Sequence, residues 1–214
     1  MPIHVYLADD HRILRDGLRA LLELQSDIRV VGEAEDGRKA LEGILEIQPD
    51  VVLMDITMPE LNGIDATQMA TLKLPKIKII ILSVHSDAEH IYRAFQAGAK
   101  GYLLKESAGE EVVKAVRAVY QDRQYISQKL SDALPLNYAR QRQERSPFEL
   151  LSAREREVLQ LTVEGATSAA IADKLNLSPK TVDTYRSRLM EKLDMQNLPE
   201  LVRFAVKHGL TPPE

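Results

Sequence analysis

Apolar and polar positions follow a repeating pattern from residue 3 to residue 120. Short apolar runs, such as the one at 51–54, predict strands that are buried on both faces. Between these runs, apolar residues recur every three or four positions, which predicts amphipathic helices. The predicted strands cover residues 3–8, 28–32, 51–54, 77–82 and 102–104, and helices are predicted near 14–22 and at 37–47, 63–72, 87–97 and 109–120.

Strands that alternate with helices in this way form parallel sheets, with helices on both faces. Each crossover from one strand to the next is almost always right-handed. The first part of the chain, residues 1–121, is therefore predicted to be an α/β domain with a five-stranded, doubly wound parallel sheet.

The pattern changes after residue 121. Residues 122–147 are polar and contain prolines at 135 and 147, which predicts a linker, with one helix near 128–134. From Ser152 onward only the helical period remains, and Ser152 and Glu155 have the spacing of a capping box, in which each side chain satisfies a free backbone N–H. Residues 148–214 are thus predicted to be an all-α domain of four helices, near 152–165 and at 168–175, 179–193 and 198–208.

Polar residues stand where the predicted strands end. The carboxyl ends of parallel strands share one edge of a sheet, and ligands bind there. Each residue also has a plain structural explanation, since aspartate is common in turns and caps and lysine at surfaces. Their common position nevertheless favours a shared site, made of Asp9, Asp10, Asp55, Ser83 and Lys105.

The residue types at this edge suit metal-assisted phosphoryl transfer. Neighbouring carboxylates repel one another, and a Mg²⁺ ion with oxygen ligands relieves that repulsion. A metal beside Asp55 neutralises the charge of an incoming phosphoryl group, and the aspartate itself can be the nucleophile, giving an acyl phosphate. Lys105 offers a point charge to phosphoryl oxygens, and Ser83 offers a hydroxyl donor.

Composition excludes several other classes of protein. The 214 residues are 44% hydrophobic and 28% charged, as in ordinary globular domains. The absence of cysteine excludes disulfides and thiolate metal sites. No apolar run is long enough to cross a bilayer and no signal peptide is recognised, so a soluble, cytoplasmic protein without a membrane partner is expected. His11 is interpreted as a mere neighbour of the aspartate pair, and the histidines at 4, 85, 90 and 208 as scattered residues that suggest no metal site.

The residues at the predicted strand ends, taken in order, resemble the receiver domain of two-component response regulators. The resemblance rests on the aspartate pair, on Asp55 with Met58, Pro59 and Gly63, on Ser83, and on the segment 98–105. It implies a flavodoxin-like fold and phosphorylation of Asp55 by a sensor histidine kinase. It also implies Mg²⁺ ligation by Asp9, Asp10, Asp55 and the Thr57 backbone carbonyl, phosphate sensing by Ser83 and Lys105, and a switch role for Tyr102. Glu106 departs from the pattern, because many receivers carry proline there.

The C-terminal segment resembles the four-helix DNA-binding domain of the NarL/LuxR type, through the segment 151–159, Gly165 and the motif residues between 171 and 193. A short helix, a tight turn and a capped second helix make a helix-turn-helix, with 179–193 as the recognition helix. The net charge of the chain is −4, yet residues 174–192 carry five basic and two acidic side chains. The predicted DNA contacts are Lys180, Thr181, Asp183, Thr184, Tyr185, Arg186, Ser187, Arg188 and Lys192.

Ala169 departs from the DNA-binding pattern. Family members often carry a lysine at this position, and that lysine touches phosphate. Each phosphate contact that is lost lowers the salt slope of binding by about 0.9. Weak binding by the monomer, and reliance on dimers, are therefore expected.

Together these features predict a transcription regulator rather than a turnover enzyme. Phosphorylation of Asp55 is expected to control dimerisation and sequence-specific binding to paired promoter half-sites. The expected partners are a sensor histidine kinase, double-stranded DNA, a second copy of the chain and RNA polymerase. Two alternatives stay open. A phosphohydrolase would need a second aspartate where Thr57 stands, and a receiver that acts through protein contacts alone has only Ala169 in its support.

Overall fold

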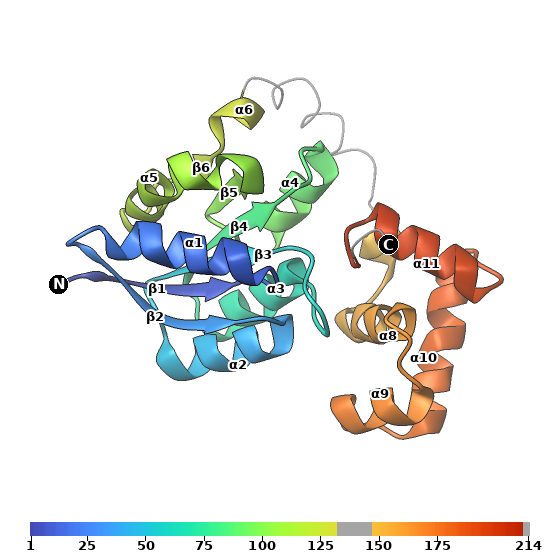
Figure 1. The fold of residues 1–214 in the computed structure, drawn as a ribbon. Coiled ribbons are helices and arrows are strands. Elements are labelled where there is room, and N and C mark those ends of the chain that lie inside the picture. The colour runs from blue at the N-terminus through green and yellow to red at the C-terminus, as the bar shows by residue number, and fades with distance from the viewer. Residues whose placement is uncertain (132–146, 212–214) are drawn as a thin grey trace. The chain divides into compact units, whose positions relative to one another are not determined.

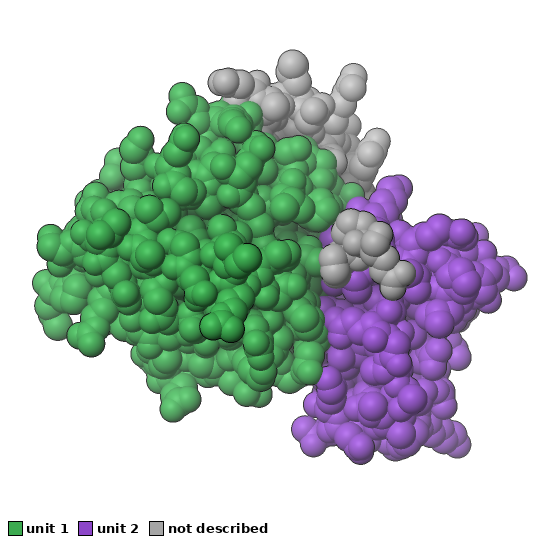
Figure 2. All heavy atoms as spheres, viewed as in Figure 1, with its two compact units in different colours: residues 1–143 green, residues 144–214 purple. Residues whose placement is uncertain are grey.

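The computed structural model describes residues 1–131 and 147–211. The chain forms two compact units, residues 1–143 and 144–214, which Figure 2 shows in different colours. Part of the predicted linker, residues 132–146, and the end of the helix predicted near 128–134 lie outside the described residues. No described helix is both long enough and apolar enough to cross a membrane.

The first unit is built on a parallel sheet in the order β2-β1-β3-β4-β5-β6 (Figure 1). This arrangement confirms the predicted doubly wound α/β fold, with a short sixth strand added. The strands are β1 (Ile3–Ala8), β2 (Ile28–Ala34), β3 (Val51–Asp55), β4 (Lys78–Ser83), β5 (Gly101–Leu104) and β6 (Tyr125–Ile126).

β6 and the short helix α6 (Gln128–Ser131) lie in the region predicted to be a linker. β6 pairs with β5, with Tyr125 opposite Gly101, and Leu130 of α6 is buried in the sheet's core. The fold of the first unit therefore extends beyond residue 121, to β6 and α6. Two residues are too few to give an apolar run, so the sequence pattern does not indicate this strand.

Helices cover both faces of the sheet because successive strand residues point to opposite sides. In β3, Val51 and Leu53 pack with α1 and α5, whereas Val52 and Met54 pack with α2, α3 and α4. All four side chains are fully buried, which explains the continuous apolar run. The helices are α1 (Arg12–Glu23), α2 (Gly37–Ile47), α3 (Gly63–Lys73), α4 (Ala88–Gln96) and α5 (Ala108–Tyr120), and a 3₁₀ turn, η1, spans Lys105–Ser107.

The second unit confirms the predicted all-α domain. Its first α-helix begins with the predicted capping box, in which Ser152 and Glu155 exchange hydrogen bonds. Ser178 caps the third helix, and Pro179 occupies its first turn, where a missing N–H costs nothing. The elements are η2 (Pro147–Leu150), α8 (Ala153–Val163), α9 (Ser168–Leu175), α10 (Pro179–Lys192) and α11 (Leu198–Lys207), and they enclose a separate apolar core.

Gly63 fixes the turn that follows β3. Its N–H donates to the carbonyl of Ile56 at 2.8 Å, and a Cβ at this position would overlap the backbone carbonyl of Asp55. Backbone atoms cannot move aside as a flexible side chain can. Only glycine therefore lets α3 begin this close to the end of β3.

We expect Gly63→Ala to lower the free energy of unfolding by about 2 kcal/mol or more, as overpacking does elsewhere. Gly17→Ala is the matched control, because Gly17 lies within α1 and has no atom within 4 Å of the added methyl group. That control should gain up to about 1 kcal/mol from helix propensity. Urea denaturation of the three proteins measures both effects, and equal stabilities for the two variants would contradict the proposed close approach.

Candidate functional sites

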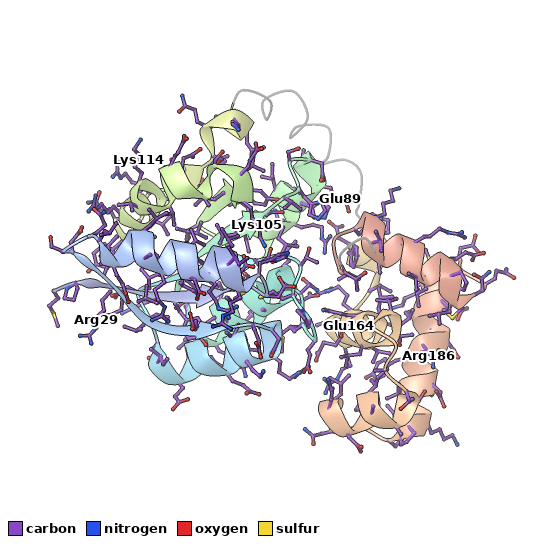
Figure 3. The ribbon with its side chains drawn as sticks, viewed as in Figure 1. Arg29, Glu89, Lys105, Lys114, Glu164 and Arg186 are labelled. Carbon is purple, nitrogen blue, oxygen red and sulfur yellow. The ribbon has the colours of Figure 1, made fainter. Side chains whose placement is uncertain are left out.

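The sheet brings the predicted carboxylates and Lys105 together at the carboxyl ends of its strands. Lys105, labelled in Figure 3, places its Nζ 2.7 Å from Asp55 Oδ2 and 2.9 Å from Asp9 Oδ2. Asp9, Asp10, His11 and Asp55 each offer a potential metal-ligand atom, and these four atoms lie within 4.8 Å of one another. Asp9, Asp10, Asp55 and Lys105, which the sequence places at strand ends, thus lie together in the structure.

Each member of this cluster is positioned by the end of its own strand. Asp55 is the last residue of β3, opposite Leu82, and Ser83 is the last residue of β4. Asp9 follows β1, and its N–H donates to the carbonyl of Ala34. Lys105 opens the 3₁₀ turn after β5. Because these strands are neighbours in the sheet, residues far apart in sequence meet at one edge.

Burial dominates the electrostatics of the cluster. Asp55 is only 2% exposed. Burial raises its pKa to about 7; the charge of Lys105 opposes this rise, and the charges of Asp9 and Asp10 add to it. Burial lowers the pKa of Lys105, but the charges of Asp55 and Asp9 outweigh this and raise it above its ordinary value. The lysine is therefore a permanent cation beside carboxylates that compete for it.

The cluster leaves oxygen atoms for a cation. Asp9 Oδ2 and Asp10 Oδ1 are buried and form ion pairs with Lys105 and His11, but neither oxygen accepts a well-formed hydrogen bond. Carboxylate oxygens in this state suit a small, hard cation. Thr57 remains a predicted ligand through its carbonyl group, and its N–H lies 3.4 Å from Asp55 Oδ1.

His11 is more closely involved than the sequence suggests. Its Nδ1 lies 3.2 Å from Asp9 Oδ1, 2.7 Å from Asp10 Oδ1 and 3.4 Å from Lys105 Nζ. The ring is mostly exposed and stands at the rim of the cluster. In the sequence, the position of His11 directly after Asp9 and Asp10 is the signal that could indicate its involvement. Adjacency in sequence, however, does not show whether the ring points towards the carboxylates.

Ser83 and Tyr102 are linked through the backbone of His85. The N–H of His85 donates to Ser83 Oγ at 2.9 Å, and Tyr102 Oη donates to the carbonyl of His85 at 2.8 Å. The Tyr102 side chain is fully buried, and burial raises the pKa of its hydroxyl. Ser83, predicted to sense phosphate, and Tyr102, predicted to be the switch, thus contact the same backbone segment between β4 and α4.

In the second unit, α9, a turn at Asn176 and α10 form the predicted helix-turn-helix. Asn176 adopts φ 53°, which reverses the chain after α9. Val182 and Leu189 face the core, and Tyr185 is half-buried against it. The predicted contacts that remain exposed on α10 are Lys180, Asp183, Thr184, Ser187, Arg188 and Lys192, while Thr181 and Arg186 are half-buried.

Several of these side chains are held by partners within the unit. Ser168 Oγ donates to Asp183 Oδ1 at 2.7 Å and lies 3.3 Å from Nη1 of Arg186, which is labelled in Figure 3. Lys192 Nζ lies 2.7 Å from Glu155 Oε2. Neither Ser168 nor Glu155 was expected to touch the recognition helix, because the sequence pattern does not show how the helices cross.

Known families and proteins match both units. The receiver domain of response regulators matches residues 5–117, and the luxR family of bacterial regulatory proteins matches residues 149–205. The chain is 38% identical over 213 residues to the oxygen regulatory protein NreC of Staphylococcus epidermidis, covering 96% of this chain and 98% of that one. It is 40% identical over 208 residues to the response regulator UvrY of Escherichia coli K12, covering 97% and 95%.

Solved structures agree with these matches. The RcsB response regulator of Salmonella typhimurium aligns with a TM-score of 0.60 and 28% identity, covering 96% of this chain and 98% of that one. An RcsB–DNA complex aligns with a TM-score of 0.60 and 27% identity, covering 97% and 99%. Both neighbours cover nearly the whole chain, so the similarity includes both units.

The raised pKa of Asp55 predicts how the stability of the fold depends on pH. The pKa of an unfolded aspartate is near 3.9, whereas burial raises the pKa of Asp55 in the folded protein to about 7. The folded state thus binds more protons between these values, and its stability falls as the pH rises through them. We expect Asp55→Asn to raise the free energy of unfolding by on the order of 2–4 kcal/mol at pH 8 without divalent metal, and by almost nothing near pH 4.

Chemical denaturation at the two pH values measures this difference. Asp16→Asn is the control, since Asp16 is exposed on α1 and should show no pH-dependent gain. An equal gain for Asp55→Asn at both pH values would mean that burial of the charge is not its cause.

Proposed function

The chain belongs to the NarL/FixJ family of two-component response regulators, which join a receiver domain to a LuxR-type DNA-binding domain, and we propose that phosphorylation of Asp55 controls its binding to promoter DNA. The family regulates transcription and does not turn over substrates. We propose domain boundaries at residues 1–121 and 148–214, with β6 and α6 as an extension of the first domain. We also propose that the protein acts in the cytoplasm.

One observation carries the proposal: a buried carboxylate stands beside a lysine and two further carboxylates. The Lys105 ammonium lies 2.9 Å from Asp9 Oδ2 and donates to Asp55 Oδ2 at 2.7 Å. An Oδ atom of Asp55 attacks the phosphorus of a phosphohistidine on the sensor kinase. The new P–O bond forms as the P–N bond breaks, and the imidazole leaves with the bonding electron pair. Lys105 then faces the phosphoryl oxygens instead of the free carboxylate.

We assign the proposed Mg²⁺ ligands to Asp9, Asp10, Asp55 and the carbonyl of Thr57. When bound, the ion neutralises the charge that gathers on the transferred phosphoryl group. The unsatisfied oxygens of Asp9 and Asp10 support this assignment. Lys105 is the residue that must share Asp9 with the ion, because its ammonium lies 2.9 Å from Asp9 Oδ2.

The signal leaves the site through Ser83. A phosphoryl group on Asp55 adds roughly −1.5 to −2 units of charge and three strong acceptor oxygens. The Ser83 hydroxyl turns towards these oxygens, which changes its bond with the N–H of His85. Because Tyr102 donates to the carbonyl of the same residue, the aromatic switch follows. We propose that the surface formed by α4, β5 and α5 then favours a homodimer.

In the second unit we propose α10 as the recognition helix, with the exposed Lys180 and Arg188 on phosphates and Asp183, Thr184, Arg186 and Ser187 towards the bases. Thr181 and Tyr185 support the helix from its half-buried side. Lys192 contributes to DNA binding only when it leaves Glu155. A phosphorylated homodimer would place two such helices on paired half-sites, and RNA polymerase is the further partner of the bound dimer. One neighbouring structure holds RcsB dimers on DNA.

We expect Asp55→Asn to abolish labelling by a small phosphodonor, such as acetyl phosphate, in the presence of Mg²⁺, because the amide is not a nucleophile for phosphorus. The control Asp16→Asn should label as the wild type does, and chelation of Mg²⁺ should suppress labelling of both active proteins. Intact-protein mass spectrometry measures the added phosphoryl group. Labelling of Asp55→Asn at the wild-type level would assign the phosphoacceptor to another residue.

We expect Lys180→Ala and Arg188→Ala each to weaken binding to all DNA sequences and to reduce the salt slope by about 0.9, the loss of one phosphate contact. Lys207→Ala, a charge-matched change on the exposed side of α11, should leave the slope unchanged. Fluorescence anisotropy at several salt concentrations measures the slope. If selection from a random DNA pool enriches no motif with phosphorylated wild-type protein, action through protein contacts alone becomes the better explanation.

A further inference from the structure

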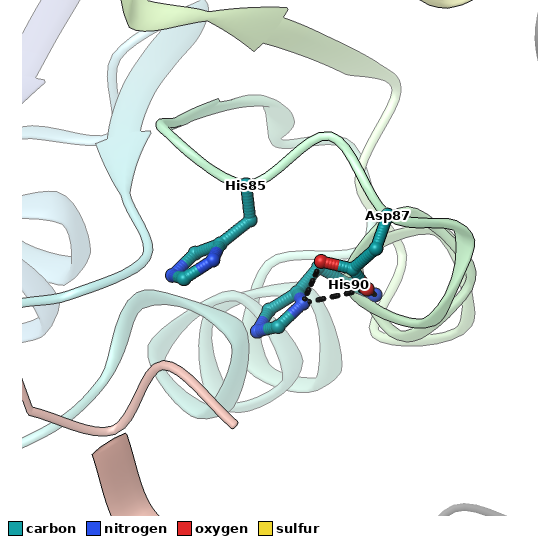
Figure 4. Close-up of side chains that lie close together, drawn as sticks. All are labelled: His85, Asp87 and His90. Carbon is teal, nitrogen blue, oxygen red and sulfur yellow. Dashed lines mark hydrogen bonds and ion pairs between the residues drawn. The ribbon is translucent and has the colours of Figure 1, made fainter. Parts of the chain in front are cut away.

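A second group of metal-ligating side chains lies in the segment between β4 and α4. It consists of His85, Asp87 and His90 (Figure 4). Each offers one potential ligand atom, and these atoms lie within 4.8 Å of one another. The two imidazole rings are stacked, with centroids 4.1 Å apart and an angle of 5° between the planes. The sequence suggests only scattered histidines, and the structure corrects this for two of them.

His90 is oriented as metal-binding histidines are. Its Nδ1 lies 2.9 and 2.8 Å from the two carboxylate oxygens of Asp87, the dashed contacts in Figure 4. A carboxylate that accepts the Nδ1 proton fixes the tautomer with its free lone pair on Nε2. His90 is only 2% exposed, so solvent does not reach its Nε2. This buried atom has no hydrogen-bond partner among the described residues. A buried nitrogen with a free lone pair is costly unless something binds it.

Asp87 is well placed to hold this ring. It caps the N-terminus of α4 by accepting from the backbone N–H of His90 at 3.2 Å. Burial raises the pKa of Asp87, but the hydrogen bond from the His90 ring outweighs this and keeps it well below its ordinary value. The carboxylate is therefore charged at neutral pH and can balance the charge of a bound cation.

His85 supplies the second imidazole of the pair. Its backbone is held by Ser83 and Tyr102, and its ring is half-buried against His90. Burial and the neighbouring His90 lower the pKa of its ring, so the imidazole stays neutral with a lone pair available. Stacked rings direct their lone pairs side by side, so coordination of one ion by both rings requires the His85 ring to turn about its side-chain bonds.

We propose that His85, Asp87 and His90 form a site for a borderline-soft divalent transition-metal ion, of the class of Zn²⁺. His90 Nε2 and the imidazole of His85 are its nitrogen ligands, Asp87 positions His90, and water completes the coordination on the exposed side. Imidazole suits this class of ion, whereas Mg²⁺ prefers oxygen. The site differs in its ligand chemistry from the carboxylate cluster and shares no residue with it.

The proposal is tested by titrating the full-length protein with Zn²⁺ in the presence of excess Mg²⁺, which occupies the carboxylate cluster, with calorimetry as the readout. We expect one Zn²⁺ ion to bind to the wild type. His85→Ala, a change of a half-buried ring that should leave the fold intact, should weaken binding at least tenfold, and Asp87→Asn should weaken it about 10- to 100-fold. The controls His4→Ala and His11→Ala should bind Zn²⁺ as the wild type does.

Co²⁺ provides a second measurement that reports the ligands directly. Its visible absorption should show four-coordinate binding with nitrogen ligands in the wild type and lose that band in His85→Ala. The proposal is overturned if the wild type binds no Zn²⁺ under these conditions, or if His85→Ala binds it with wild-type affinity. Loss of binding in His11→Ala alone would also overturn it, because the ion would then belong to the carboxylate cluster.

Discussion

The ion pair between Lys105 and the buried aspartates is the interaction on which the first unit's chemistry depends. Asp9 and Asp55 lie almost wholly out of solvent, and one ammonium group lies within 3 Å of both. A buried carboxylate without a partner destabilises a fold by several kcal/mol. The cluster is therefore held together by a single cation, whose place beside Asp9 a metal ion can partly take and whose partner a phosphoryl group on Asp55 would change.

The parallel sheet is what makes such a cluster possible. Its central strand β3 is apolar up to Asp55 because helices bury both of its faces, so a charged residue is accommodated only where that strand ends. The ends of β1, β3, β4 and β5 then gather charged and polar residues at a single edge, and Gly63 lets α3 begin against the end of β3. Site and core follow from one constraint, namely that the interior accepts no unpaired charge.

The sequence predicts the architecture and the carboxylate cluster because both follow from periodicity and strand ends. It does not predict features set by how elements cross or how rings turn. β6 is too short to leave a pattern, and the stacking of His85 on His90 depends on the turn before α4. The contacts of Ser168 and Glu155 with α10 require the angle between helices, which no local spacing encodes. The sequence therefore predicts the side-chain roles on α10 only as a group, whereas the structure separates exposed residues from half-buried ones.

The contact between Glu155 and Lys192 joins two tasks in one side chain. Glu155 closes the capping box at the start of α8 and also holds the last turn of α10, so it ties the beginning of one helix to the end of another. A lesion at this glutamate would fray α8 and loosen α10 together. In a genetic screen, substitutions of Glu155 would have the same phenotype as substitutions that remove DNA contacts. Their primary defect would nevertheless be the loss of the interactions that position α10.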